Sequence, residues 1–212
     1  MKKQRTIVYI DGFNLYYCAL RKTKCKWLNL EKLCESILVP ASHDIRKIKF
    51  FSARISARPD DPNAPTRQDV YWRALKSFCP KVEIIEGFFL SSEKFSYLAP
   101  CAGKGFVKTV KTEEKGSDVN LAVHMLNDAW KNEYDCAILL SNDSDMYESA
   151  SLVKANCGKR IGWLYPDNPE IHLSKKLMGV VDFKRKITTA VLAASQLPTP
   201  IPGTTITKPA SW

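Results

Sequence analysis

The segment "TIVYIDGFN", residues 6–14, sets the first element of the fold. Its short apolar run, residues 7–10, predicts a buried strand that ends directly at Asp11. The segment "ILLSNDSDMYESA", residues 138–150, repeats the arrangement, because its apolar run leads into Asp143 and Asp145. Carboxylates in such places are either ordinary turn residues or ligands of a cation. The rest of the sequence favours one of these interpretations.

Predicted strands and helices alternate along the chain. The strands are expected at residues 7–10, 45–53, 81–90, 136–141, 159–166 and 180–187, and the helices at 15–21, 29–38, 68–78, 117–130, 145–156 and near 170–177. Alternation of this kind is typical of a parallel sheet with helices on both faces. We therefore predict an α/β fold, with three α/β/α layers and a mainly parallel central sheet.

The segment 91–116 admits two interpretations. It is either a strand pair that turns at "GKG", residues 103–105, or an irregular basic loop. A phosphate-binding loop is disfavoured, because the rest of the P-loop spacing is missing. In the helix that follows, Ser117 is a candidate N-cap. One apolar face of this helix is expected to be buried, and it consists of Val119, Ala122, Val123, Leu126 and Trp130.

The chain is expected to form one domain over residues 1–190, followed by a tail at 191–212. From residue 197 the tail reads "LPTPIPGTTITKPASW", with four prolines and no helical period. It is expected to be extended or disordered, with Trp212 as a candidate anchor.

Composition narrows the class of protein. The chain has 212 residues, 45% of them hydrophobic, and no apolar run approaches the roughly 20 residues that span a bilayer. The basic start "MKK" leads into a strand and not a signal peptide, so we expect a cytoplasmic protein without a membrane partner. Seven scattered cysteines without a C-x-x-C pair predict reduced thiols, and the three separated histidines argue against a histidine zinc site.

The formal net charge is +10, and basic clusters such as "RKTKCK" at 21–26 and "RKIK" at 46–49 contribute to it. Such an excess favours a polyanionic partner, above all a nucleic acid. A solvated basic surface without a ligand is the alternative.

The aspartates are expected to converge. In an open parallel sheet, ligands bind at the carboxyl ends of the strands, where Asp11, Asp143 and Asp145 are placed. Asp118, at the start of a predicted helix, would face the same end, and Asn14 would add an amide at this rim. Close carboxylates repel one another unless a cation lies between them, and Mg²⁺ or Mn²⁺ prefers such oxygens. Each aspartate alone could instead be a helix cap.

Three segments resemble the motifs of the NYN domain family, which includes LabA-like bacterial proteins and belongs to the PIN-like nucleases: "YIDGFNLYY" (9–17), "KGSDVNLAVHML" (115–126) and "LLSNDSDMYESA" (139–150). The resemblance extends over residues 5 to about 187. It implies a PIN-like, Rossmann-like fold and a metal site formed by Asp11, Asp118, Asp143 and Asp145, with Asn14 beside them. Asn142 and Ser117 depart from the residues usual in the family, but neither change removes a carboxylate.

The working hypothesis is a ribonuclease that hydrolyses RNA phosphodiester bonds with Mg²⁺ or Mn²⁺. Candidate RNA contacts are Lys115, Arg54, Arg58 and Arg67. One alternative is an inactive module of the same fold that binds RNA or a protein. A dehalogenase-like phosphohydrolase is disfavoured, because Phe13 replaces the second acid that its mechanism needs. A homodimer is also possible for PIN-like domains.

Overall fold

The computed structural model describes residues 2–97 and 105–212, and within these ranges seven strands form one sheet in the order β4-β3-β2-β1-β5-β6-β7. The strands are β1 (Gln4–Asp11), β2 (His43–Ala53), β3 (Val82–Tyr97), β4 (Phe106–Lys115), β5 (Cys136–Leu140), β6 (Arg160–Pro166) and β7 (Phe183–Ile187). All neighbouring pairs are parallel except β3 and β4, which are antiparallel. The predicted α/β class with a mainly parallel sheet is confirmed.

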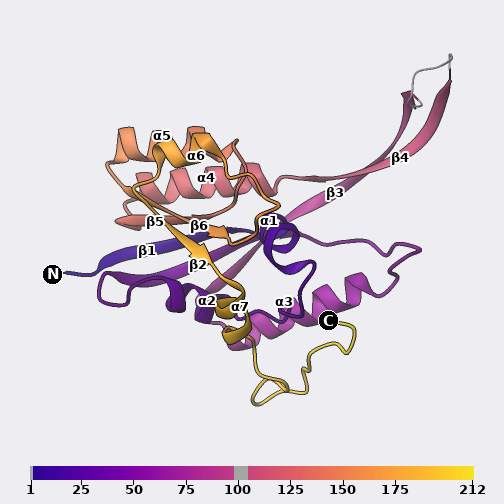
Figure 1. Ribbon diagram of the computed structural model, residues 1–212, viewed down its shortest axis with the longest axis horizontal. Helices are drawn as coiled ribbons and strands as arrows, with labels where there is room; N and C mark the ends of the chain where they lie inside the picture. The colour runs from indigo at the N-terminus through magenta and orange to yellow at the C-terminus, as the bar shows by residue number, and fades with distance from the viewer. Residues whose placement is uncertain (1, 98–104) are drawn as a thin grey trace.

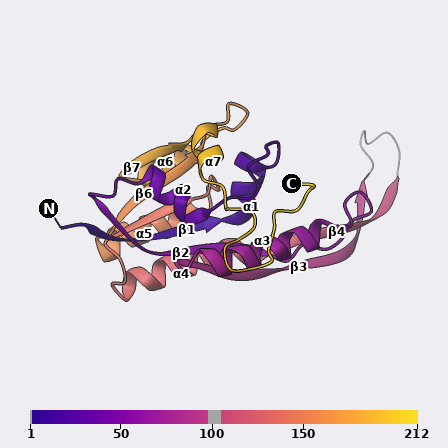
Figure 2. The same ribbon diagram turned by 90° about the horizontal axis from the view of Figure 1, so that it is seen from below.

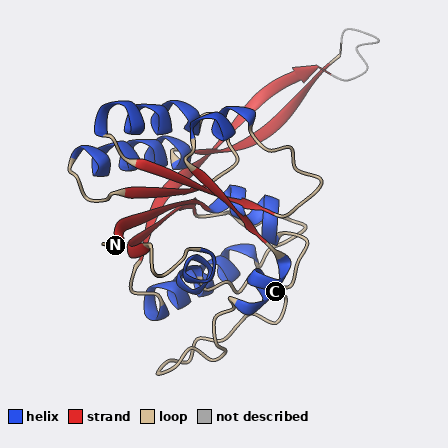
Figure 3. Ribbon diagram, turned by 60° about the vertical axis from the view of Figure 1, so that its left-hand side comes forward, coloured by secondary structure: helices blue, strands red, loops and turns tan. Residues whose placement is uncertain are grey.

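Helices cover both faces of the sheet, as Figure 3 shows. They are α1 (Gly12–Leu15), the π-helix η1 (Tyr16–Leu20), α2 (Leu30–Ile37), α3 (Ala64–Phe78), α4 (Ser117–Trp130), α5 (Met146–Cys157), α6 (Lys175–Val180) and α7 (Thr189–Ala194). One buried core contains side chains of α2, α3 and α7, and a second contains those of α4, α5 and α6. The fold therefore has three layers. Among the described residues, no helix is long and apolar enough to cross a membrane.

Strands β1 and β5 lie next to each other in the middle of the sheet, with Ile10 paired to Leu140. Every residue of β5 is buried, as are Ile7 to Asp11 of β1. Both helical layers thus cover these strands, which explains their continuous apolar runs. Because the two strands are parallel neighbours, Asp11 and the residues after Leu140 leave the sheet at the same edge.

The segment after residue 90 forms a strand pair and not an irregular loop. Strand β3 runs on to Tyr97 and pairs with β4, from Phe88 opposite Lys115 to Tyr97 opposite Phe106. This ribbon, which we call the arm (residues 88–97 and 105–115), extends away from the rest of the molecule in Figures 1 and 2. The first two residues of the expected "GKG" turn lie outside the described residues.

The tail does not leave the domain. Its first residues belong to α7, after which Leu197 and Ile201 are buried. Trp27 donates a hydrogen bond from its indole Nε1 to the Pro198 carbonyl oxygen (3.0 Å), and the Trp212 ring packs on Trp27 at 6.1 Å between centroids. Figure 2 shows the C-terminal segment passing the helices on that side of the sheet. The segment is extended but packed.

Candidate acidic site

Asp11 joins the ends of the two central strands. One of its carboxylate oxygens accepts a hydrogen bond from the backbone N–H of Asn14 (2.9 Å), which caps the short helix α1. The other accepts from the hydroxyl of Ser141 (3.0 Å), which follows β5. The side chain is therefore fixed at both oxygens, and burial raises its pKa above the ordinary value for aspartate.

Hydrogen bonds continue from Ser141 through the loop after β5. The Ser141 hydroxyl accepts from the backbone N–H of Asp143 (3.1 Å), and a carboxylate oxygen of Asp143 accepts from the backbone N–H of Asp145 (2.9 Å). The Asn14 side-chain oxygen accepts from the backbone N–H of Asn142 (3.1 Å). These bonds fix the position of the Asp143 loop relative to the end of β1.

Asp118 reaches the same place from helix α4. The chain turns at Gly116, whose φ of 95° lies in the left-handed region that favours glycine, and α4 begins at Ser117. The Glu114 carboxylate accepts from the backbone N–H of Ser117 (3.0 Å), so the end of β4 caps the helix that carries Asp118.

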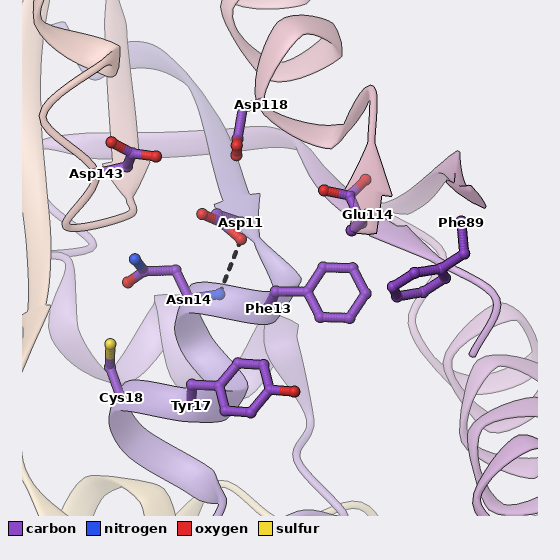
Figure 4. Close-up of a pocket in the computed structure, with 9 residues that line it drawn as sticks. All are labelled: Asp11, Phe13, Asn14, Tyr17, Cys18, Phe89, Glu114, Asp118 and Asp143. Atoms are coloured by element: carbon purple, nitrogen blue, oxygen red, sulfur yellow. Dashed lines mark hydrogen bonds between the residues drawn. The ribbon is translucent and has the colours of Figure 1, made fainter. Parts of the chain in front are cut away.

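These side chains line one pocket of about 360 Å³. Its nine lining residues are Asp11, Phe13, Asn14, Tyr17, Cys18, Phe89, Glu114, Asp118 and Asp143. In Figure 4 the carboxylates of Asp11, Asp118 and Asp143 point toward one another, and the rings of Phe13 and Phe89 meet at one side. Four of the nine residues are acidic and none is basic, so the pocket favours a positively charged or metal-bound ligand.

Burial and charge repulsion both raise the pKa of Asp118. Burial comes first, and the nearby charges of Asp11 and Asp143 add to it, so that the pKa of Asp118 is raised to about 6. Burial and the charge of Asp11 also raise the pKa of the Cys18 thiol, which keeps that thiol protonated at neutral pH. The pocket is thus acidic without a compensating cation from the protein.

Asp145 and the predicted RNA-contact residues do not line the pocket. Asp145 is exposed at the start of α5 and does not line the pocket. Lys115 lies 3.4 Å from Glu113, and Arg54 donates to Glu86 at 2.9 Å while stacking over Trp72. The remaining two arginines are also paired, Arg58 with Asp60 at 3.7 Å and Arg67 with Asp61. All four candidate RNA contacts are therefore close to acidic partners.

Two pocket residues come from the arm, and sequence reasoning did not find them. Phe89 and Glu114 are directly opposite each other in the β3–β4 ladder, so they share one face of the ribbon. The strand at 81–90 was predicted from the sequence, but its register with β4 was not. Phe13 and Tyr17, which follow Asp11 closely in the sequence, also contribute aromatic surface to the pocket.

The donor set fits a hard divalent cation in its chemistry, since the three converging carboxylates are oxygen ligands. Within the described residues, however, no three His, Cys, Asp or Glu side chains form a ready-made metal cluster. A cation would therefore need to draw the carboxylates together. Figure 4 shows that Asp11, Asp118 and Asp143 already face the same space.

Comparison with known proteins agrees with this fold. Residues 5–182 match the model of the NYN domain. The chain is 35% identical over 239 aligned positions to 6-hydroxy-3-succinoylpyridine 3-monooxygenase of Pseudomonas putida, covering 98% of this chain and 75% of that protein. A solved structure of a protein of unknown function from Vibrio parahaemolyticus is similar with a TM-score of 0.56 and 17% identity, over 88% of this chain and 96% of that one.

The fold and the acidic pocket define a PIN-like α/β protein of nuclease-like architecture. The chain belongs to the NYN domain family. The family resemblance carried by the three sequence motifs is thereby confirmed, while the structural neighbour supports the fold alone.

Proposed function

We propose that this protein is a metal-dependent ribonuclease that hydrolyses RNA phosphodiester bonds. One observation carries the proposal: Asp11, Asp118 and Asp143 come from three separate elements and line one pocket that contains no basic side chain. Burial, with the nearby charges of Asp11 and Asp143, raises the pKa of Asp118, and a carboxyl perturbed in this way inside a pocket is typical of a functional site. Membership in a family with a nuclease-like fold supports the assignment.

Asp11, Asp118 and Asp143 would hold a Mg²⁺ or Mn²⁺ ion. A cation bound there would supply a water of lowered pKa and stabilise the charge that develops on the scissile phosphate. Asn14 would position a phosphate oxygen with its amide nitrogen, because its side-chain oxygen is occupied by the Asn142 N–H. Asp145 would act through Asp143, whose carboxylate its backbone N–H contacts. The basic surface of a chain with net charge +10 would attract the RNA backbone.

The test uses labelled single-stranded and structured RNAs in EDTA, Mg²⁺ or Mn²⁺. Asp143→Asn should lower metal-dependent cleavage by roughly 100-fold or more, since such a metal contributes several kcal/mol to the transition state. Asp44→Asn is the matched control, because Asp44 lies at the start of β2, at the opposite end of the strands from the pocket. RNA binding without cleavage in any metal would replace the ribonuclease by a binding module. Full activity of Asp143→Asn would remove Asp143 from the site.

A second candidate function follows from the relative named a monooxygenase, which the chain matches over 98% of its length. Phe13, Tyr17 and Phe89 give the pocket an aromatic wall against which a planar heteroaromatic ring could stack. The test is incubation with 6-hydroxy-3-succinoylpyridine, dioxygen and a two-electron donor, followed by mass spectrometry of the products. Incorporation of one labelled oxygen atom from ¹⁸O₂ would establish this function. Unchanged substrate beside active RNA cleavage would favour the ribonuclease.

A further inference from the structure

A second pocket adjoins the acidic pocket. It has a volume of about 200 Å³, and Tyr17 and Cys18 line both pockets as a common wall. In the view of Figure 4, these two side chains lie on the other side of Asn14 from Asp118. Helix η1 carries the common wall, and the loop after β6, residues 167–170, also lines the second pocket. We call this cavity the η1 pocket.

The side chain of Asn168 connects the two elements that line the η1 pocket. Its Nδ2 donates a hydrogen bond to the Cys18 carbonyl oxygen (3.1 Å), and its Oδ1 accepts one from the Glu170 backbone N–H (3.0 Å). The Lys22 ammonium, just after η1, lies 2.7 Å from the Glu170 carboxylate. The pocket is therefore formed before a ligand binds, which reduces the entropy lost on binding.

The guanidinium of Arg21 is left without a partner in this pocket. Of the other charged lining residues, Lys22 is paired with Glu170 at 2.7 Å and Asp167 is paired with Lys186 at 3.1 Å. Within the described part of the chain, the Arg21 side chain forms neither an ion pair nor a hydrogen bond. It is therefore available to a negatively charged ligand, and its planar set of donors matches the oxygens of a phosphate.

Helix η1 places Arg21 beside an exposed aromatic ring. The Arg21 backbone N–H donates to the Tyr16 carbonyl oxygen (2.7 Å), five residues back, and such π-helical turns are frequent at functional sites. The Arg21 Cζ atom lies 5.6 Å from the centroid of the Tyr17 ring, which is 57% exposed. An exposed ring next to an unpaired guanidinium offers one group for a base and one for a phosphate of a single strand.

A ligand that reaches both pockets must be an extended molecule. Asn14 and Arg21 are seven residues apart on the continuous α1–η1 helix, which is roughly 10 Å. RNA carries a negative charge at every nucleotide, so one phosphate can lie at the acidic pocket while another lies on Arg21. Lys24 and Lys26, further along the same basic cluster, also form no ion pair with any described residue.

The arm offers a less suitable surface for a polyanion. All of its lysines are already paired with glutamates: Lys94, Lys111 and Lys115 with Glu113, and Lys108 with Glu93. The unpaired positive charge next to the acidic pocket therefore lies along η1 and the basic cluster that follows it.

We propose that the η1 pocket is a substrate subsite that binds a nucleotide close to the cleaved phosphate, with its phosphate on Arg21 and its base on Tyr17. The inference rests on the proposed function, because RNA is its ligand. A base can stack on an aromatic side chain when it is unpaired and free of its neighbours. The subsite therefore selects single-stranded RNA over a duplex.

The first experiment measures binding of a short labelled single-stranded RNA by fluorescence anisotropy in EDTA. Arg21→Gln should reduce the slope of the logarithm of the association constant against the logarithm of salt concentration by about 0.7, the value of one phosphate contact. Arg185→Gln is the matched control, since Arg185 lies 5.6 Å from the centroid of the Phe183 ring but lines neither pocket. No RNA binding by the wild type, an unchanged slope for Arg21→Gln, or an equal change for Arg185→Gln would overturn the proposal.

The second experiment compares a single strand with a duplex of the same sequence. Tyr17→Ala should lower affinity for the single strand by roughly 10-fold, as the loss of one stacked base does, and leave duplex affinity unchanged. Tyr17→Phe keeps the ring and should bind like the wild type. Tyr97→Ala, at a 70% exposed tyrosine of the arm, should have no effect. Equal affinity of the wild type for both RNAs, or an equal loss for Tyr97→Ala, would contradict the subsite. Matching circular dichroism spectra verify that the variants are folded.

Binding and cleavage assays together separate this inference from the proposed function. If RNA is cleaved in Mg²⁺ or Mn²⁺ and the Tyr17→Ala and Arg21→Gln variants bind and cleave it like the wild type, the subsite is wrong and the ribonuclease stands. If RNA binding depends on Tyr17 and Arg21 but no metal supports cleavage, the subsite stands and the ribonuclease is wrong.

Discussion

Ionisation of the Asp118 carboxylate is unfavourable in the acidic pocket. Its pKa is raised to about 6, so ionisation opposes folding. Below about pH 3 the group is protonated in both the folded and the unfolded chain and has no effect. As the pH rises through the folded pKa the destabilisation develops fully, and it persists above pH 7. We therefore expect Asp118→Asn to stabilise the protein at neutral pH in EDTA, by about 1 kcal/mol once solvent screening is allowed for.

The measurement is thermal unfolding at pH 7.5 and pH 3. The variant should melt about 2–4 °C above the wild type at pH 7.5, and the difference should vanish at pH 3. Asp60→Asn serves as control, because Asp60 is exposed and does not line the pocket. A variant that is less stable than the wild type at pH 7.5 would show that Asp118 is a structural cap.

Cation binding should depend on pH for the same reason. Since Asp118 loses its proton only above about pH 6, the Mg²⁺ or Mn²⁺ affinity should rise between pH 5 and 7. Isothermal titration with Mn²⁺ at several pH values measures this, and Asp118→Asn should flatten the profile. An affinity that is constant from pH 5 to 7 would contradict a role for Asp118 in holding the ion.

The position after Asp11 has room for glycine and for no larger residue. A Cβ at this position would lie 2.7 Å from the Phe50 ring and 2.8 Å from the Phe51 carbonyl oxygen, closer than real contacts allow. Gly12→Ala should therefore destabilise the protein by about 1–3 kcal/mol, which urea unfolding would measure. Gly179→Ala is the control, because nothing lies within 4 Å of its added Cβ. Equal stability of both variants would show that β2 can move away freely.

Among the helices and strands, the sequence predicted an element correctly where its hydrophobic pattern allowed one interpretation. Fully apolar runs identified β1 and β5, and their parallel pairing brings Asp11 and Asp143 together. The prediction for α4 was wrong about the buried face. Val119, Val123 and Trp130 are exposed, because α4 carries two apolar faces and periodicity cannot tell which one meets the sheet. The contribution of the arm to the pocket depends on strand register, which no local pattern encodes.

The packing of the tail against the domain predicts that the tail contributes to the free energy of unfolding. Ile201 is almost completely buried beyond α7, in the same core as Trp27 and Leu197. Ile201→Ala should lower the free energy of unfolding by about 2–5 kcal/mol, as removal of buried methyl groups does. Thr205→Ala, at an exposed position of the same segment, should change it little. If urea unfolding gave equal values for both variants, the tail would not belong to the cooperative fold.

The net positive charge of the molecule predicts that RNA binding depends on salt concentration. The logarithm of the association constant for single-stranded RNA should fall linearly with the logarithm of the salt concentration, because bound counterions are released from the phosphates. Replacing Arg21, Lys24 and Lys26 by glutamine should lower that slope by up to about 2. The same change at Lys175, Lys176 and Lys184, on α6 and β7, is the comparison. Equal slopes in filter-binding assays would show that the 21–26 cluster is not the RNA-binding surface.

The arm connects one wall of the acidic pocket to a distant end of the molecule. Phe89 and Glu114, which form part of the pocket wall, belong to the same two strands as Tyr97 and Phe106 at the far end. Eight residues of strand separate Phe89 from Tyr97, a span of about 27 Å. The two strands leave the body at Gly87, where a side chain would collide with Glu114 and the Lys115 carbonyl oxygen. A force applied to Tyr97 or Phe106 would therefore reach the Phe89 and Glu114 wall of the acidic pocket through these two strands.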